Sequence, residues 1–487
     1  MRKSYSNQLR LDCVSIEQVA LNFESRDEIV PVLAGLQHVY SQFDLRDHLM
    51  QLVAGDVNAE TRDDIGREGF TYWAILVLSV VRLGCNLDYD KLQDLCENHR
   101  CLRGILGEGE WGHTSFDWRR IRATVSLLKP ETLEKINQTI VSHGQDVHGA
   151  ARSRVRADSF VCETNIHYPT ESSLIWDGMN KLIPLCRKLA RGIGEQGWRQ
   201  SSYQLKQIKQ QVREIARLSA SKSPTVKKGI YPAYGVLLER VGHVLDRLRR
   251  LRLACELVDL NSANAKLLAK IERFYTPTSQ VVSTAYRRTQ LGETVANSEK
   301  IFSIYETHTQ LYRRGKAGEP NQFGRLIMVY EDAAGFISHY NLMQRDEMDV
   351  DVVVAQTKIA QQKHDGQIED ASFDRGYFST ENQTNLEAIV SHPCLPPRHR
   401  NQYAQWLDKA SVRTHSSNKR HSGIESAIGS FQRGNGMKRC RDRTERGLKR
   451  YLGLAVLGRN IHVLGKLVIK QANEKSEAAR TKRKKAG

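Results

Sequence analysis

Two features that place a chain outside the cytoplasm are missing from the sequence. The most apolar run, residues 73–81, is far shorter than the ~20 residues that a membrane span needs, and residues 1–5 lack the apolar stretch of a secretory signal. The nine cysteines are an odd number without paired spacing, so they indicate reduced thiols rather than disulfides or a zinc site. We therefore expect a cytoplasmic protein without a membrane partner.

Acidic residues are outnumbered in this chain. The 487 residues include 73 Lys and Arg but only 55 Asp and Glu, which gives a formal net charge of +18 and a pI near 9.5. Such a charge predicts a polyanionic partner, and nucleic acid is the commonest one. A basic soluble protein without such a partner is the alternative. The length allows two to four domains with a sizeable core.

Residues 1–150 are predicted to form an N-terminal helical, DNA-binding domain. An apolar helix over residues 70–83 is followed by a turn at Gly84, and Asp88 is placed to cap a second helix. Helix, short turn and helix is the outline of a helix-turn-helix motif. An ordinary helical hairpin has the same outline.

The pattern changes near residue 151, where residues 151–176 are predicted to begin an α/β domain. Residues 154–162 are rich in β-branched and apolar side chains and predict a strand. Its alternation places Asp158 on the same face as Phe160 and Cys162. An acid on an apolar face is costly unless it is paired or binds a metal ion.

Residues 177–299 return to helical periodicity and are predicted to form a coiled-coil-like insertion. Apolar residues step by three and four over residues 205–215 and again over 237–258, which predicts a long antiparallel hairpin. Its exposed Lys and Arg side chains suit a clamp or a dimerisation arm on DNA, while the apolar stripe alone indicates packing. The basic segment 471–487 has no apolar partners and is predicted to be a disordered tail.

Residues 300–470 are predicted to complete the α/β domain. Strands at 326–330 and 336–342 flank a turn, and a helix at 349–362 precedes a strand that ends at Asp374. A helix capped by Ser379, a strand at 388–390 and a helix with an apolar stripe follow. This order is typical of a mixed sheet with flanking helices.

Three acids fall at useful positions within this order. Asp158 lies inside the first strand, Asp374 ends a later strand, and Glu425 lies beside the apolar stripe of the last helix. Phosphodiester chemistry uses such carboxylates to hold two Mg²⁺ or Mn²⁺ ions about 4 Å apart. Glu163, Glu331 and Asp332 also lie near strands, and we interpret them as turn or surface residues.

Three sequence motifs, in this order, resemble those of bacterial insertion-sequence transposases of the DDE class, nearest the ISNCY group. They are residues 157–170 (ADSFVCETNIHYPT), residues 372–377 (SFDRGY) and residues 421–429 (HSGIESAIG), which lead to residues 457–460 (LGRN). The resemblance covers most of the chain. It, rather than periodicity, singles out Asp158, Asp374 and Glu425 from the 55 acids.

The resemblance implies a ribonuclease-H-like catalytic domain, with an N-terminal all-helical domain and a long helical insertion. It also implies that the three acids bind divalent metal, and that the protein cuts and joins the inverted repeats at the ends of its own element. Double-stranded DNA, both terminal repeats and target, would be the partner, and two copies of the chain would meet in the synaptic complex.

The sequence departs from the related pattern around Glu425. Many related enzymes have a Tyr and an Arg before the glutamate and a Lys seven residues after it, but here His421 precedes it and Gln432 follows. Basic residues near the acids are predicted to contact DNA phosphates instead. They are Arg313, Arg314, Lys316, Arg375, Lys419, Arg420, His421, Lys438, Arg439 and Arg441.

The sequence therefore predicts a DNA transposase that cleaves at inverted-repeat ends and transfers the strand into target DNA. Two other functions fit the same residues. One is a structure-specific DNA nuclease with the same fold, which hydrolyses but does not join. The other is a DNA-binding regulator derived from a transposase that has lost catalysis.

Overall fold

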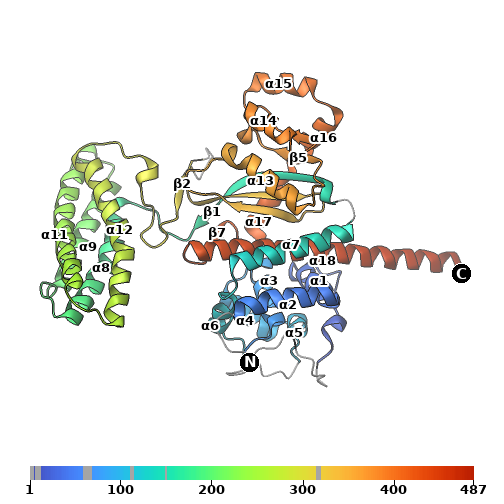
Figure 1. The fold of residues 1–487 in the computed structure, drawn as a ribbon, viewed down its shortest axis with the longest axis horizontal. Coiled ribbons are helices and arrows are strands. Elements are labelled where there is room, and N and C mark those ends of the chain that lie inside the picture. The colour runs from blue at the N-terminus through green and yellow to red at the C-terminus, as the bar shows by residue number, and fades with distance from the viewer. Residues whose placement is uncertain are drawn as a thin grey trace. The chain divides into compact units, whose positions relative to one another are not determined.

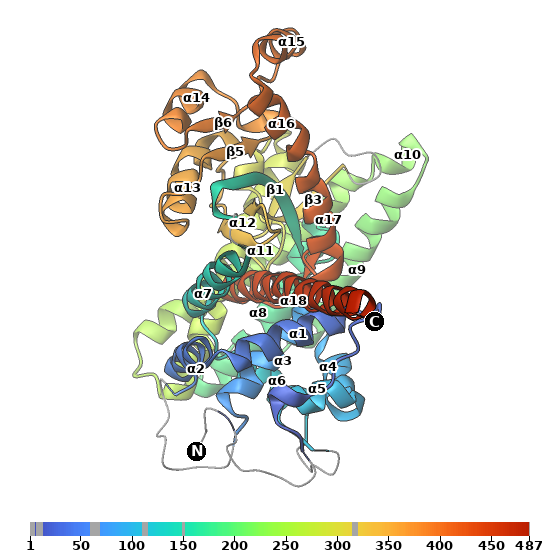
Figure 2. The ribbon, with the colours of Figure 1, turned by 90° about the vertical axis from the view of Figure 1, so that its right-hand side faces the viewer.

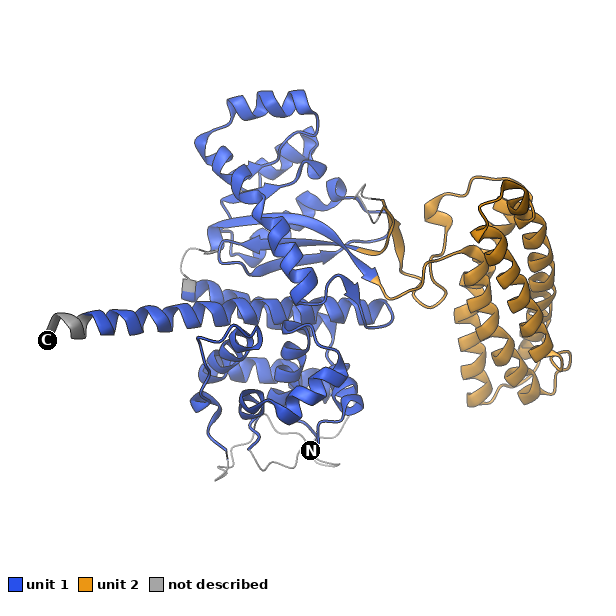
Figure 3. Cartoon of the chain, turned by 180° about the vertical axis from the view of Figure 1, so that it is seen from behind, with its two compact units in different colours: residues 1–163, 326–487 blue, residues 164–325 orange. Residues whose placement is uncertain are grey.

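The chain divides into two compact units in the computed structural model, which describes residues 5, 13–58, 69–109, 115–148, 151–313 and 320–486. Unit 1 comprises residues 1–163 and 326–487, and unit 2 comprises residues 164–325 (Figure 3). The first α/β segment was predicted to span residues 151–176, whereas unit 1 extends from residue 1 to residue 163 and unit 2 begins at residue 164. Unit 1 carries the three acids and is described first.

Unit 1 is built on a mixed sheet. Its strands are β1 (Arg154–Thr164), β3 (Gln322–Asp332), β4 (Ile337–Leu342), β5 (Asp370–Phe373), β6 (His392–Cys394) and β7 (Arg439–Cys440). The strand order is β3-β1-β5-β6, with β4 paired to β3 and β7 paired to β1. β5 runs parallel to both β1 and β6, whereas β3 and β4 form an antiparallel hairpin with Gly335 at φ +92° in its turn. The predicted mixed α/β architecture and the predicted hairpin are confirmed.

Helices cover the two faces of this sheet. They are α13 (Asp349–Lys363), α14 (Thr380–Glu387), α15 (Arg400–Lys409), α16 (Val412–His421) and α17 (Gly423–Gly434). Figure 2 shows α13 and α14 on one side of the strands and α16 and α17 on the other. Ser379 caps α14 as predicted, because its hydroxyl accepts from the backbone N–H of Asn382 at 3.0 Å.

The predicted strand at residues 388–390 is wrong. The N–H groups of Ile389 and Val390 both donate to the carbonyl of Leu386, so these residues form a turn at the C-terminus of α14. The strand that pairs with β5 is β6, two residues further on. A short apolar run marks burial but does not distinguish a strand from a buried turn.

The N-terminal helices belong to the same compact unit as the sheet. They are α1 (Ile29–Ser41), α2 (Phe43–Val57), α3 (Tyr72–Gly84), α4 (Tyr89–Asn98), α5 (Arg100–Ile105), α6 (Trp118–Val125) and α7 (Pro130–His148). α18 (Glu445–Ala486) packs against α1, α3, α7 and β4, and it lies between the sheet and the helices α1 and α3 (Figures 1 and 2). One apolar core therefore extends through both parts, and the prediction of a separate domain over residues 1–150 differs from the structure.

α18 also corrects the prediction for the end of the chain. It runs without a break to Ala486, where the sequence predicted a disordered tail from residue 471. Within the described residues, its segment Glu445–Thr481 is long and apolar enough to cross a membrane. However, 72% of its most apolar window is buried inside the protein, as is typical of a core helix.

The predicted helix-turn-helix region contains the two expected helices, α3 and α4. Asp88 caps α4 by accepting from the N–H of Lys91 at 2.8 Å. Every residue of α3 is buried, and α4 exposes the carboxylates of Asp90, Asp94 and Glu97. These acids would repel phosphates, whereas the exposed Lys91 on the same helix would attract them, so a DNA-reading role for α4 stays a prediction.

Unit 2 is a helical bundle with a core of its own. Its helices are α8 (Glu171–Ile193), α9 (Ser201–Ala220), α10 (Pro224–Lys227), α11 (Ile230–Glu256) and α12 (Ser262–Gln290). The predicted hairpin corresponds to α9 and α11, which pack against each other. In addition, α8 and α12 pack against them and complete the core. The short strand β2 (Gln310–Tyr312) follows and pairs with the start of β3.

The contact of α1 with α18 depends on glycine. A Cβ built on Gly465 would lie 1.7 Å from the Pro31 carbonyl oxygen and 2.9 Å from the backbone nitrogen of Gly35. Both are backbone atoms and cannot rotate away. We therefore expect Gly465→Ala to lower the free energy of unfolding of unit 1 by at least about 2 kcal/mol, measured by urea unfolding.

Gly55→Ala is the matched control for this prediction. Gly55 lies in α2 with nothing within 4 Å of its Cβ position, so alanine should leave stability unchanged or raise it by up to about 1 kcal/mol. Equal urea midpoints for the two variants would show that the helix crossing tolerates a side chain.

Candidate active site

The pairing of β1 with β5 places two of the predicted acids side by side. Ala157 is aligned with Phe373 in the parallel ladder, and the next residue on each chain is an aspartate, Asp158 and Asp374. Neighbouring strands lie about 4.8 Å apart, so these two residues occupy adjacent positions. Each carboxylate accepts a 2.7 Å hydrogen bond from the N–H of the following residue. Asp158 is half-buried and Asp374 is exposed.

The third acid, Glu425, lies in the first turn of α17. The apolar stripe of this helix, Ile424, Ala427, Ile428 and Phe431, is buried, and the Phe431 ring packs edge-on against Phe160 of β1 at 5.9 Å. Glu425 lies beside this stripe and is exposed. The anchoring of α17 on β1 therefore holds Glu425 at the margin of the face that carries Asp158.

His421 connects Glu425 with Asp374. Its Nδ1 lies 3.2 Å from the Ser372 hydroxyl, on the strand that precedes Asp374. Burial lowers the pKa of His421, while the nearby carboxylates of Asp374 and Glu425 raise it. Both acids are thus electrostatic neighbours of one imidazole. His421 and Glu425 belong to successive helices, because α16 ends at His421 and α17 begins at Gly423.

The donor set suits a hard divalent cation, since carboxylate oxygens are the ligands that Mg²⁺ and Mn²⁺ prefer. Over the described residues, however, no three His, Cys, Asp or Glu side chains are gathered closely enough to hold a metal ion. The backbone thus brings the acids to one region in positions suited to such an ion, but their side chains are not converged on a common point.

An ion-pair network fixes the start of α17. The guanidinium of Arg156 donates to Glu331 through Nε at 2.6 Å and contacts it through Nη2 at 2.5 Å, and its Nη1 donates to the Arg420 carbonyl at 3.0 Å. A Cβ on Gly423 would lie 2.1 Å from that Nη1, so the guanidinium passes directly against this residue. Arg459 approaches the same glutamate at 3.7 Å. Glu425 follows Gly423 by two residues, so this network helps to set its position.

The prediction that Glu331 and Asp332 are turn or surface residues was wrong in one respect. Their exposed fractions are only 2% and 3%, so both are buried. Asp332 does hold the turn, since its Oδ1 accepts from the N–H groups of Ala334 and Phe336. Burial raises the pKa of Asp332 to about 7, and it also raises the pKa of Glu331 against the opposing effect of Arg156.

A fourth acid near the site, Asp349, was not singled out by sequence. Tyr377 is fully buried, and its pKa is raised well above the ordinary value by burial and then by the charges of Asp349 and Asp158. Asp349 Oδ2 also lies 3.8 Å from the Cβ position of Gly376. In the sequence, Asp349 reads as an acid at a helix N-terminus, a position that carboxylates favour without any catalytic role.

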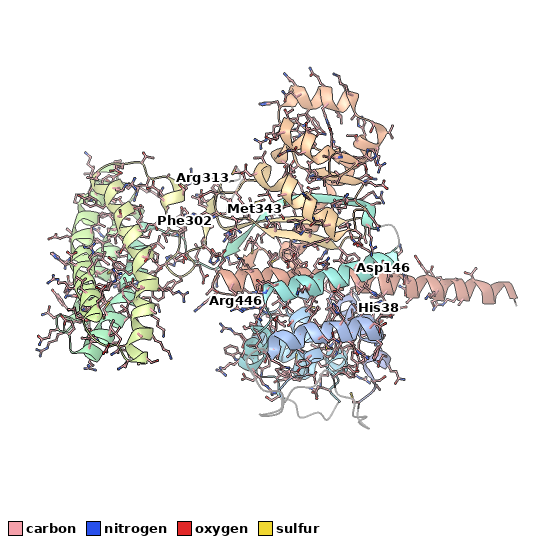
Figure 4. All side chains as sticks on the ribbon, in the orientation of Figure 1. His38, Asp146, Phe302, Arg313, Met343 and Arg446 are labelled. Carbon is pink, nitrogen blue, oxygen red and sulfur yellow. The ribbon has the colours of Figure 1, made fainter. Side chains whose placement is uncertain are left out.

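The predicted DNA-contacting residues divide into several groups. Lys419 and Arg420 are exposed on α16, and Arg375 is exposed with its guanidinium 3.8 Å from the centre of the Tyr403 ring. Arg313 is exposed directly after β2 in unit 2 (Figure 4). Arg314 and Lys316 lie outside the described residues.

Three predicted DNA-contacting residues, Lys438, Arg439 and Arg441, follow α17, and the two arginines are engaged within the protein. Arg439 forms a 2.9 Å ion pair with Glu163, and Arg441 donates to the Asn86 side chain at 2.8 Å and to the Tyr451 hydroxyl at 3.2 Å. Arg441 thus joins the loop before α18 to the α3–α4 turn, and its predicted role in DNA contact is unsupported. Lys438 and Arg439 are both exposed.

The Arg156 network can be tested by stability. Arg156→Ala leaves Glu331 buried with only the longer contact to Arg459, and should lower the free energy of unfolding by about 3 kcal/mol. Arg154→Ala, two residues earlier on the same strand face, should change it by less than about 0.5 kcal/mol because that side chain is exposed. Urea unfolding at neutral pH gives both values.

The unfolding free energy that Arg156→Ala loses relative to wild type should depend on pH, because Glu331 titrates. Its pKa is raised in the folded protein and rises further without Arg156, so protonation favours the folded variant. The loss of unfolding free energy relative to wild type should therefore be smallest near pH 4.5. It should grow as the pH rises through the pKa of Glu331 in the folded protein. A deficit that is constant with pH would contradict the assignment of a buried, charged Glu331.

Comparison of the chain with protein-family models, with curated proteins and with solved structures found no match. The geometry of the site and the motif resemblance are therefore the two sources for a functional interpretation. Both concern Asp158, Asp374 and Glu425.

Proposed function

We propose that this chain is a DNA transposase that cleaves at inverted-repeat ends and transfers the freed strand into target DNA. The observation that carries the proposal is the strand register that aligns Asp158 with Asp374 on adjacent parallel strands. Glu425 is an electrostatic neighbour of the same His421 as Asp374. Three separate motifs thus contribute acids to one region of unit 1.

The strand order supports a ribonuclease-H-like assignment of this sheet. β1 carries the first acid and lies between the β3–β4 hairpin on one side and the parallel strands β5 and β6 on the other. The chain order of hairpin, α13, β5, α14 and β6 is the order expected for that fold from the resemblance. The N-terminal helices and the bundle of unit 2 are then additions to the catalytic sheet.

Asp158, Asp374 and Glu425 would hold the Mg²⁺ or Mn²⁺ ions, with Asp349 as a further oxygen donor nearby. When bound, such ions activate the attacking oxygen and stabilise the leaving oxygen of a phosphodiester. The chain itself supplies the orientation: the hydrogen bonds from Ser159 N–H and Arg375 N–H fix one oxygen of each aspartate. Neighbouring carboxylates repel one another, and bound divalent cations would offset that repulsion.

Exposed cations around the acids supply contacts for DNA. Lys419, Arg420, Arg375 and Lys438 are exposed on the segments next to Asp374 and Glu425. Contacts of this kind provide affinity that falls with salt rather than choice of sequence. Two copies of the chain would hold the two element ends, as the resemblance implies.

Substitution of each acid tests the proposed chemistry. Asp158→Asn, Asp374→Asn and Glu425→Gln should each reduce cleavage and joining by at least about 1,000-fold, because each removes a charge from the metal site. The assay incubates the protein with Mg²⁺, a pre-cut element end and a circular target plasmid. DNA affinity, measured by fluorescence anisotropy, should stay within about threefold of wild type.

Glu163→Gln is the control, because Glu163 lies on β1 but forms an ion pair with Arg439 instead of facing the site. It should keep cleavage and joining. If wild type nicks DNA but forms no joined product, the chain is a nuclease with this fold. If it binds DNA without nicking, it is a regulator, and in either case the transposase proposal fails.

Metal binding can be read without catalysis through thermal unfolding. In EDTA, Asp374→Asn should melt at or above the wild-type temperature, because it relieves carboxylate repulsion. In excess Mn²⁺ the order should reverse, since a ligand at about 100 times its Kd adds about 2.7 kcal/mol of stability to wild type alone. Equal Mn²⁺ shifts in both proteins would place the ion elsewhere. Asp349→Asn should give an intermediate shift.

A further inference from the structure

A cavity of about 350 Å³ lies on the same sheet face as Asp158 and Asp374. Its walls come from the starts of β1 and β5, the turn between β3 and β4, and α16. The residues that matter for its chemistry are Arg154, Arg156, Arg420, Glu331, Asp332 and Asp370. Its volume falls within the range of sites for small organic ligands.

The carboxylates of this cavity already have partners. Glu331 is paired with Arg156, and Asp370 accepts two hydrogen bonds from Arg413, at 2.7 and 2.9 Å. Asp332 accepts from two backbone N–H groups and from Gln145, and the rise of its pKa to about 7 reduces its negative charge at neutral pH. None of these acids is therefore left to attract a cation into the cavity.

The arginines of the cavity are not all matched in this way. Arg156 is committed to Glu331, but Arg154 and Arg420 are exposed and form no ion pair within the described parts of the chain. The Arg420 guanidinium is oriented by the Ser417 hydroxyl at 3.1 Å, and both residues line the cavity. Two guanidinium groups over a neutralised floor favour an anion, and their planar fork fits phosphate oxygens.

The cavity lies next to the proposed active site along the strands. Arg154 and Arg156 precede Asp158 on one strand face, and Ser372, which lines the cavity, precedes Asp374 by two residues. Two residues of a strand span about 7 Å. Ser372 also contacts His421, the neighbour of Asp374 and Glu425. A ligand in the cavity would therefore lie immediately next to the acids.

We propose that this cavity binds one nucleotide of a DNA strand, with its phosphate on Arg154 and Arg420 and its sugar and base against Ala333 and Ala334. The proposal rests on the proposed function for its choice of DNA as the source of the nucleotide. The charge and volume of the cavity apply to any phosphate-bearing ligand of this size. The proposed site would hold the DNA strand directly beside the acids of the proposed active site.

The experiment uses the full chain in EDTA, so that metal ions at the acids do not contribute. Binding of thymidine 5′-monophosphate, thymidine and inorganic phosphate is compared by ligand-detected NMR. We expect the monophosphate to bind at least about tenfold more tightly than thymidine, because the guanidinium groups supply most of the attraction. The double variant Arg154→Ala/Arg420→Ala should abolish this difference.

Two further variants control for folding and for general charge. Arg446→Ala removes an exposed arginine at the start of α18 that does not line the cavity (Figure 4), and should bind the monophosphate as wild type does. Ala333→Glu places a carboxylate at the exposed cavity rim and should weaken binding as strongly as the double variant. Both are exposed positions, so the melting temperature should be unchanged.

A short 5′-phosphorylated single-stranded oligonucleotide distinguishes a DNA strand from a free nucleotide. It should displace the monophosphate from wild type, and bind the double variant more weakly than it binds Arg446→Ala. Absence of monophosphate binding, equal binding by the double variant, or failure of the oligonucleotide to compete would each overturn the proposal. Because these measurements need no cleavage, they hold or fail separately from the strand-transfer assay.

Discussion

The parallel pairing of β1 with β5 is the constraint on which the proposed site depends. These strands lie on either side of the helical insertion in the chain, so their pairing is a long-range contact that only the folded sheet provides. A shift of the register by one residue would turn Asp374 to the other face of the sheet. The neighbouring contacts of Arg156 with Glu331 and of Phe431 with Phe160 hold β3 and α17 to the same strand. The positions of all three acids thus depend on the contacts that β5, β3 and α17 make with β1.

α18 explains why the N-terminal helices and the sheet form one unit. It presents apolar side chains to α1, α3 and α7 as well as to the sheet, and it meets α1 and α3 at glycines that permit backbone contact. A Cβ on Gly458 would lie 2.4 Å from the backbone nitrogen of Gly84. Such close crossings fix helix positions more strictly than larger interdigitating side chains do. A change at these helices can therefore reach β4 and the hairpin it forms with β3.

The sequence identified local features well and their partners poorly. The strand containing Asp158, the β3–β4 turn and the caps at Asp88 and Ser379 depend on neighbouring residues, and all are present in the structure. The burial of Glu331 depends on an arginine from another strand, which no local pattern reveals. The same limit applies to Arg441, whose partners lie on the α3–α4 turn and on α18.

In the candidate site, too, local sequence features could be predicted but tertiary neighbours could not. Asp158, Asp374 and Glu425 were chosen through motif resemblance, and strand register then placed the first two side by side. Asp349 was overlooked because an acid at a helix start has an ordinary explanation in the helix dipole. Only its nearness to Gly376 and Tyr377 distinguishes it from Asp351, which accepts from the Met348 N–H and caps the helix. The difference between a capping acid and a site acid is therefore one of tertiary position.

The distribution of charge in unit 1 gives the strongest physical reason to expect a ligand. Three carboxylates with little exposure form ion pairs, Glu331 with Arg156, Asp370 with Arg413 and Asp442 with Arg82, while the buried Asp332 is held by hydrogen bonds instead. In the described structure, Asp374 and Glu425 form no ion pair with Lys or Arg, and on the same side Arg154 and Arg420 have no carboxylate partner. Stability alone would favour pairing these charges with one another. Their separation into an acidic group and a basic cavity leaves one suited to cations and the other to phosphate, which is the division that a metal-dependent enzyme acting on DNA requires.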